Sequence, residues 1–151
     1  IVNRNNDFSH WIDFDGWNEP NIPYLEIISY THISGGDISG TLLYADSPFV
    51  IDGDLTVQPE DFLDIEPNVI IYFSGDFSLT VLGTITTQFE PNDTIRFQPL
   101  DDFSIWRGIK LGDNFGMPAQ LQFMNVFMKN ADIGLEILSG DAMIDVTTIL
   151  K

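Results

Sequence analysis

The chain has 151 residues, enough for one domain of ordinary size, and 44% of them are hydrophobic and 13% aromatic, which suffices for a core. With 23 acidic and 6 basic side chains the formal net charge is −17, which argues against nucleic acid or anionic lipid surfaces as partners. The absence of cysteine excludes disulfides and thiolate chemistry, and no apolar run approaches the ~20 residues that cross a bilayer.

Residues 1–30 are the part of the chain whose structure the sequence indicates least, and residues 1–10 are polar. Residues 18–23 form a turn with two prolines, and residues 24–33 fit a strand or a short helix. A glycine-rich turn over 34–40 and a short strand over 41–44 follow. The next segment indicates stacked coils, and an uncovered first coil would expose apolar side chains and strand edges. We therefore interpret residues 1–46 as an N-terminal cap with a first, irregular coil.

Aromatic and acidic residues occur together between residues 11 and 19. Trp11 and Trp17 are candidate platforms for sugar rings, whose C–H faces suit aromatic surfaces, or else they seal the N-terminal coil. The candidate calcium ligands in this stretch are Asp13, Asp15, Asn18 and Glu19. Their spacing departs from that of the regular calcium-binding loop, and an acidic surface loop is the alternative interpretation. The sequence predicts no cofactor, and calcium at these residues is the alternative.

Between residues 47 and 111, short apolar segments alternate with tight turns. The segments contain β-branched or aromatic residues, and most place apolar side chains two positions apart, as in a strand with one buried face. They are 55–57, 63–65, 69–73, 79–81, 84–86, 95–97 and 109–111. Turn sequences such as Gly-Asp, Glu-Pro-Asn and Leu-Gly-Thr separate them. Short strands that repeat at roughly two dozen residues indicate a β-solenoid, in which each coil stacks on the next.

These strands, with those that follow, can be grouped into coils of three. The expected strands are 55–57, 62–66 and 69–73, then 79–82, 84–88 and 94–98, then 106–111, 120–123 and 126–129, and last 134–138 and 142–147. Val57 and Val81 then occupy equivalent positions 24 residues apart. The predicted fold is all-β, a single right-handed parallel β-helix of about three to four coils over residues 47–151, after the cap over residues 1–46. The alternative is an antiparallel β-sandwich or jelly roll.

The stretch from Ser47 to Leu111 resembles the N-terminal part of secreted bacterial parallel β-helix proteins of the pectate-lyase-like superfold. The matching positions are Ser47 to Phe49, Ile51 to Asp54, Leu55 to Val57, Leu63 to Asn68, Leu79 to Thr84, Ile95 to Phe97 and Trp106 to Leu111. Asn68 stands where glycine is usual, but asparagine also adopts positive φ, so we expect the turn to be kept. The resemblance implies the fold and an extracellular location. It implies no single function, because this superfold includes enzymes, adhesins and inert scaffolds.

Five Gly-Asp pairs lie between the predicted strands and are expected to form turns, in which glycine supplies positive φ and aspartate closes the turn. The pairs begin at Gly36, Gly53, Gly75, Gly112 and Gly140. The alternative is that their carboxylates align on one edge and bind calcium. Their spacings of 17, 22, 37 and 28 residues are not constant, which argues against a regular row of metal ions.

Asp101 and Asp102, close to Arg107, are the best candidates for catalysis. Two carboxylates near an arginine could serve a polysaccharide lyase or hydrolase as cation ligands or as acid and base. Arg107 is more simply interpreted as the partner of surface acids. Trp106 is either a third sugar-stacking candidate or a packing residue of the coil. Because the two histidines lack the partners of a catalytic triad, we predict no catalytic residues and no enzyme.

The last residues, 147–151, fit a strand, and no polar closing cap follows them. We expect that either the native polypeptide continues or a second molecule covers this end. The predicted function is a non-catalytic structural or adhesion module, extracellular or on the cell surface, that associates end to end. The alternative is a β-helix that binds or processes carbohydrate. The expected partners are further copies of the chain or a glycan, with no nucleic acid and no membrane span.

Overall fold

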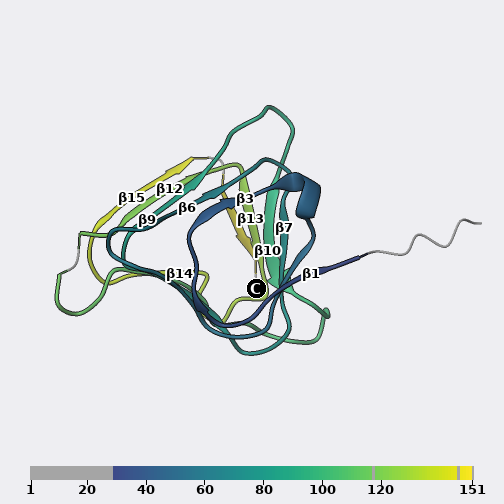
Figure 1. Cartoon of the computed structure of the whole chain (residues 1–151), viewed down its shortest axis with the longest axis horizontal. Coiled ribbons are helices and arrows are strands. Elements are labelled where there is room, and N and C mark those ends of the chain that lie inside the picture. The colour runs from purple at the N-terminus through teal and green to yellow at the C-terminus, as the bar shows by residue number, and fades with distance from the viewer. Residues whose placement is uncertain (1–28, 117, 146, 151) are drawn as a thin grey trace, which may run out of the picture.

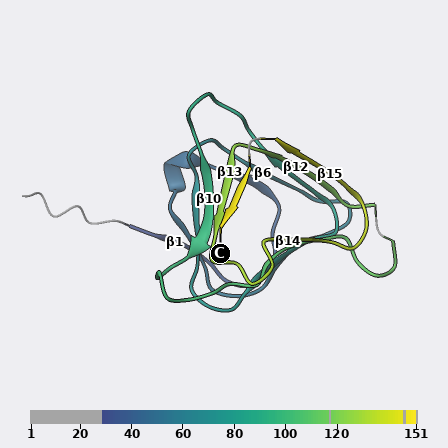
Figure 2. The same ribbon diagram turned by 180° about the vertical axis from the view of Figure 1, so that it is seen from behind.

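The computed structural model describes residues 29–116, 118–145 and 147–150, and within them the chain is a right-handed parallel β-helix (Figures 1 and 2). Sixteen short strands and one 3-10 helix, η4 (Tyr44–Asp46), make up its regular structure. The strands lie in three sheets, named here A, B and C, and every strand pair is parallel. The predicted β-helix is confirmed, and parallel pairing rules out the antiparallel sandwich.

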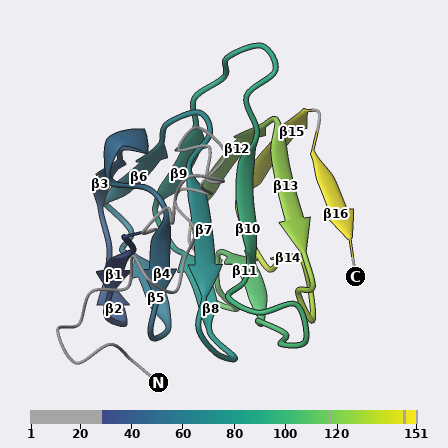
Figure 3. The same cartoon turned by 90° about the vertical axis from the view of Figure 1, so that its right-hand side faces the viewer.

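Each turn of the chain contributes one strand to each sheet. Sheet A contains β1 (Thr31–Ile33), β4 (Phe49–Ile51), β7 (Ile70–Phe73), β10 (Ile95–Pro99), β13 (Val126–Lys129) and β16 (Thr148–Leu150). Sheet B contains β2 (Gly36–Asp37), β5 (Leu55–Val57), β8 (Ser78–Val81), β11 (Gly108–Leu111) and β14 (Leu135–Ile137). Sheet C contains β3 (Gly40–Leu42), β6 (Phe62–Ile65), β9 (Thr84–Thr87), β12 (Gln120–Met124) and β15 (Asp141–Asp145). Figure 3 shows the strands of sheet A in succession from β1 to β16.

The register between coils follows the repeat that the sequence predicts. Leu55 pairs with Leu79 and Val57 with Val81, both 24 residues apart. The strands β4 to β15 make four coils, within the predicted three to four, and β1 to β3 form a coil before them in the same three sheets. The structure describes only residues 29–46 of the predicted cap, so the boundary at residue 46 stays a prediction.

The core consists of columns of inward-facing side chains that run through successive coils. In sheet B, Leu55, Leu79 and Ile109 stack on one another, and each is at most 3% exposed. Aromatic rings from different sheets also pack together in the core. The ring of Phe97 stacks on that of Phe123, and the two ring centroids are 5.9 Å apart. Because side chains alternate inward and outward along each strand, the opposite residues form polar columns on the surface.

Two corner residues explain how successive coils approach closely. Asn68 has φ of 63°, which confirms the left-handed turn expected from the Glu-Pro-Asn sequence. Its side-chain oxygen accepts a hydrogen bond from the backbone nitrogen of Thr94 in the next coil at 3.2 Å. At Gly83 a Cβ atom would collide with the carbonyl oxygens of Gln58 and Asp61, so the chain tolerates only glycine there.

Candidate functional site

Most of the predicted ligand-binding residues lie outside the described part of the chain. These are the aromatic candidates Trp11 and Trp17 and the calcium candidates Asp13, Asp15, Asn18 and Glu19. Their roles stay predictions. Among the residues that the structure describes, no group of three or more histidine, aspartate or glutamate side chains is arranged to hold a metal ion.

Trp106, the third sugar-stacking candidate, is in the core. Its side chain is 0% exposed and stacks on Phe73, with ring centroids 4.1 Å apart and planes inclined by 11°. Its indole Nε1 donates a hydrogen bond to the carbonyl oxygen of Lys129 at 2.9 Å. The ring offers no face to solvent, and its position agrees with the interpretation of Trp106 as a packing residue of the coil.

Arg107 follows Trp106 and points to the surface, where it contacts carboxylates from two earlier coils. Its Nε lies 3.4 Å from Asp76 Oδ2, and its Nη1 lies 4.0 Å from Asp54 Oδ2. Asp54 also accepts a hydrogen bond from the backbone nitrogen of Ser78 at 2.8 Å. Two of the Gly-Asp turns therefore supply partners for Arg107, as the simpler interpretation of this arginine expected.

The Gly-Asp turns are not all alike in backbone conformation. Gly36, Gly112 and Gly140 have positive φ, as expected, whereas Gly53 and Gly75 are not among the glycines in that region. A Cβ atom on Gly53 would lie 2.7 Å from the Cα of Gly35, so close approach between coils requires glycine at this turn.

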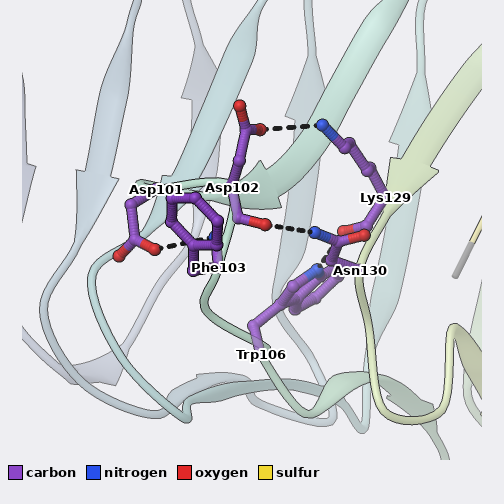
Figure 4. Close-up of polar contacts among 6 residues, drawn as sticks. All are labelled: Asp101, Asp102, Phe103, Trp106, Lys129 and Asn130. Carbon is purple, nitrogen blue, oxygen red and sulfur yellow. Dashed lines mark hydrogen bonds and ion pairs between the residues drawn. The ribbon is translucent and has the colours of Figure 1, made fainter.

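Asp101 and Asp102 take separate structural roles in the loop between β10 and β11 (Figure 4). Asp101 accepts a hydrogen bond from the hydroxyl of Ser104 at 2.6 Å. It accepts another from the backbone nitrogen of Phe103 at 2.9 Å, which Figure 4 shows. These bonds, that of Ser104 first, lower the pKa of the Asp101 carboxyl. Asp102 forms an ion pair with Lys129 Nζ at 2.8 Å. Each carboxylate is thus engaged by its own loop or by the next coil, and neither pairs with Arg107 within the described residues.

The same loop displays a residue that the sequence did not single out. The side chain of Phe103 is 98% exposed, although the loop that carries it is well anchored. The Asp101 side chain closes the turn, and the carbonyl oxygen of Asp102 accepts a hydrogen bond from Asn130 Nδ2 at 3.2 Å. Trp106, at the end of the loop, is fixed in the core. The aromatic ring of Phe103 therefore projects into solvent from a loop whose backbone is fixed by hydrogen bonds.

A hollow of about 290 Å³ lies beside Phe103. Its lining combines apolar and polar groups: Phe103, Ser104, Ile105, Asn130, Ala131 and Asp132. A second hollow of about 190 Å³ lies over sheet B, where Arg107 and Lys110 line it, and it shares Asp132 with the first. In the second hollow, Lys110 Nζ lies 3.6 Å from Glu136 Oε2. The two hollows are thus neighbours that have the side of Asp132 in common.

His32 is at the N-terminal end of sheet A rather than in the core. Its side chain is 61% exposed, and its Nδ1 lies 2.6 Å from Asp52 Oδ2 in the next coil. The hydroxyl of Ser74, one coil further, donates to Asp52 Oδ1 at 2.7 Å. Hydrogen bonds from His32 and then from Ser74 lower the pKa of the Asp52 carboxyl. The serine contacts the carboxylate and not the imidazole, so these three residues do not form a nucleophile and its base.

The C-terminal coil exposes positions that are buried in the coil before it. In β14, β15 and β16 the inward-facing Ile137, Ile144 and Ile149 are 51%, 46% and 46% exposed. Their register partners in the preceding coil are Leu111, Phe123 and Met128, which are 0%, 0% and 1% exposed. The core columns thus run to this end of the described chain and stop there uncovered.

Comparisons with known proteins identify no relative of this chain. No family model matches, and neither a curated protein nor a solved structure is significantly similar. Within the described residues there is no helix long and apolar enough to cross a membrane.

Proposed function

We propose that this chain is a non-catalytic structural or adhesion module of the extracellular space or cell surface, and that its copies associate end to end. The observation that carries the proposal is the C-terminal coil, whose Ile137, Ile144 and Ile149 are half exposed at positions that are buried one coil earlier. A further coil laid on β14, β15 and β16 would continue all three sheets and cover these side chains.

The strand edges at both ends of the helix suit such an addition. Among the described strands, β14, β15 and β16 are each last in their sheet, and β1, β2 and β3 are each first. An edge strand presents unpaired backbone groups that can pair with another chain. If the predicted N-terminal cap leaves the edge of β1, β2 and β3 open, a first coil placed on a last coil keeps every strand parallel. Because the two surfaces differ, repeated association then gives an open row of copies.

The energies favour a weak, reversible association. Burying the exposed half of an isoleucine side chain contributes about 1 kcal/mol, so Ile137, Ile144 and Ile149 together contribute about 3 kcal/mol. Loss of translational and rotational freedom costs about 4–15 kcal/mol. Apolar burial is insufficient alone, and backbone hydrogen bonds between the end strands, each worth about 0.5–1.5 kcal/mol net, must supply the remainder.

The charge of the chain supports an association that depends on ionic strength. Each copy carries a formal charge of −17, so two copies repel each other. The screening length falls from roughly 30 Å at 0.01 M salt to roughly 8 Å at 0.15 M. We therefore expect association to strengthen with salt, unlike association through ion pairs, which salt weakens.

Sedimentation velocity of the 151-residue chain over a concentration series tests the proposal. The expected result at 0.15 M NaCl is a weight-average mass that rises with concentration, and a smaller rise at 0.01 M. A strict monomer at every soluble concentration and at both ionic strengths would refute end-to-end association.

Carbohydrate binding is the second candidate function, and one observation favours it. Phe103 presents a fully solvated aromatic ring beside a hollow lined by hydrogen-bonding groups. This ring, unlike that of Trp106, is available to a ligand. Binding to an array of glycans that is lost when Phe103 is replaced by alanine would support this candidate.

A further inference from the structure

We propose that the hollow beside Phe103 binds a pyranose ring that carries a protonated amino group, as in oligomers of glucosamine. The inference rests on the second candidate function and names its ligand class and its residues. The hollow is lined by Phe103, Ser104, Ile105, Asn130, Ala131 and Asp132, which come from the loop between β10 and β11 and from the start of the segment after β13.

The ring of Phe103 supplies the apolar contact. It is 98% exposed, and hydrogen bonds from the turn to Asp101 hold its backbone in place, so little order is lost when a ligand binds. Figure 4 shows the ring beside Asp101 and Asp102, at the rim of the loop. The C–H face of a pyranose fits an aromatic face of this kind, and a positive charge near the ring adds a cation–π attraction.

The polar lining distinguishes a sugar from an apolar partner. Ser104, Asn130 and Asp132 line the hollow together with Ile105. The hydroxyl of Ser104 and the Nδ2 of Asn130 already donate hydrogen bonds to Asp101 and Asp102. A purely apolar partner would therefore chiefly cover the carboxylate of Asp132 without a hydrogen bond, and an unsatisfied group costs about 1–3 kcal/mol, more when it is charged. Sugar hydroxyls satisfy such groups while the ring face covers the apolar ones, which is the mixture expected of a small-molecule site.

The charges favour a cationic sugar over a neutral or an anionic one. The carboxylate of Asp132 lines the hollow and makes no hydrogen bond or ion pair with the described residues. Asp102 is paired with Lys129 and Asp101 with its own turn, which leaves Asp132 to meet an ammonium group. With a formal charge of −17, the chain also repels uronic acids and attracts cations.

The second hollow extends the site in one direction. It shares Asp132 with the first and continues over sheet B past Arg107 and Lys110, whose charges are balanced by Asp76 and Glu136. A second sugar unit linked to the first would lie there against groups that both donate and accept hydrogen bonds. We expect an oligomer to bind more tightly than the monosaccharide.

Isothermal titration calorimetry with a glucosamine oligomer in 0.15 M NaCl tests the site on the 151-residue chain. An N-acetylglucosamine oligomer and a galacturonic acid oligomer of the same length serve as neutral and anionic comparisons, and oligolysine of equal charge tests simple charge attraction. Phe103→Ala is expected to weaken binding of the glucosamine oligomer at least about tenfold. Asp132→Asn should weaken it by about threefold to tenfold and leave binding of the neutral oligomer unchanged.

Phe115→Ala is the matched control. Phe115 is 94% exposed and lies in a turn closed by Asp113, as Phe103 lies in one closed by Asp101, but it is at the other end of β11. It should bind the oligomer within about twofold of the parent chain. All three positions are solvent-exposed, and unchanged melting temperatures verify that the variants fold.

Several results would overturn the proposal. The proposal fails if the chain does not bind the glucosamine oligomer or if Phe103→Ala leaves that binding unchanged. It also fails if the neutral or anionic oligomer binds as tightly as the glucosamine oligomer, or if oligolysine competes with it equally well. Binding of the neutral oligomer that equals that of the glucosamine oligomer and still requires Phe103 would leave carbohydrate binding standing while the amino-sugar inference fails. The sedimentation of the unliganded chain is a separate measurement, so end-to-end association stands or fails independently.

Discussion

The uncovered face of the last coil, formed by β14, β15 and β16, is called the end surface. Ile144→Lys changes this end surface at an inward-facing position, and Met143→Lys changes the neighbouring outward-facing position. Ile144 continues the column of Phe123, whereas Met143 continues that of the exposed Gln122. Both substitutions add the same charge to the same strand, β15. Only the first places that charge where another copy would have to cover it.

The expected magnitude follows from burial. Ile144 is 46% exposed, so its replacement removes about 1 kcal/mol of apolar burial from the association, and covering an unpaired ammonium adds at least as much again. A loss of about 2 kcal/mol or more corresponds to a dissociation constant raised roughly 30-fold. Met143→Lys is a surface change and should stay within about 0.5 kcal/mol.

Sedimentation velocity of the two variants at equal concentration and 0.15 M NaCl measures this difference. Ile144→Lys should sediment as a monomer where the parent chain and Met143→Lys associate. If both variants associate as the parent does, the end surface is not the contact. If both become monomeric, the outward-facing position of Met143 also lies in the contact, and the argument from burial is wrong.

Three further predictions concern the core, the pH dependence and calcium. Trp106→Ala should lower the free energy of unfolding by about 3–5 kcal/mol, because a wholly buried ring stacked on Phe73 is lost, and denaturant titration that shows less than about 1 kcal/mol would contradict this packing. The pKa of Asp52 lies below its ordinary 3.8, so the bonds from His32 stabilise the fold above pH 3.8 and this stability is lost as the pH falls below it. Urea titrations should therefore show a steeper acid loss for the parent than for Asp52→Asn, and equal slopes would count against the pair. If Asp13 and its neighbours bind calcium, millimolar Ca²⁺ should raise the melting temperature, and chelation that changes nothing would remove this prediction.

The fold was predictable because its signal repeats along the chain. Alternating apolar residues in segments such as 55–57 and 79–81 indicate one buried face, and their 24-residue offset gives the register. The left-handed turn at Asn68 was likewise predictable, since the turn requires positive φ and asparagine adopts it. The coil of β1 to β3 was harder to predict, because its strands are only two or three residues long and two of them, β2 and β3, begin with glycine.

The candidate site was much less predictable, for two physical reasons. Loop residues have no alternation, so the sequence did not distinguish Trp106, wholly buried, from Phe103, fully exposed three positions earlier. Contacts such as those of Arg107 with Asp54 and Asp76 join different coils and become visible only when the register is known. An aspartate two residues before a loop phenylalanine, at Asp101 and again at Asp113, is the one local signal that could have pointed to these turns.

Inter-copy cross-linking tests the stacking of coils across two molecules most directly. The outward-facing column Asp37, Thr56, Thr80, Lys110 and Glu136 runs through sheet B from the first coil to the last. The chain has no cysteine, so Asp37→Cys and Glu136→Cys each introduce a single thiol. Neighbouring strands lie roughly 4.8 Å apart, so stacked copies bring these two thiols within reach of a short bifunctional thiol reagent. A cross-linked dimer that forms only when the two variants are mixed is the predicted result, and its absence, or dimers of Glu136→Cys alone, would contradict end-to-end stacking.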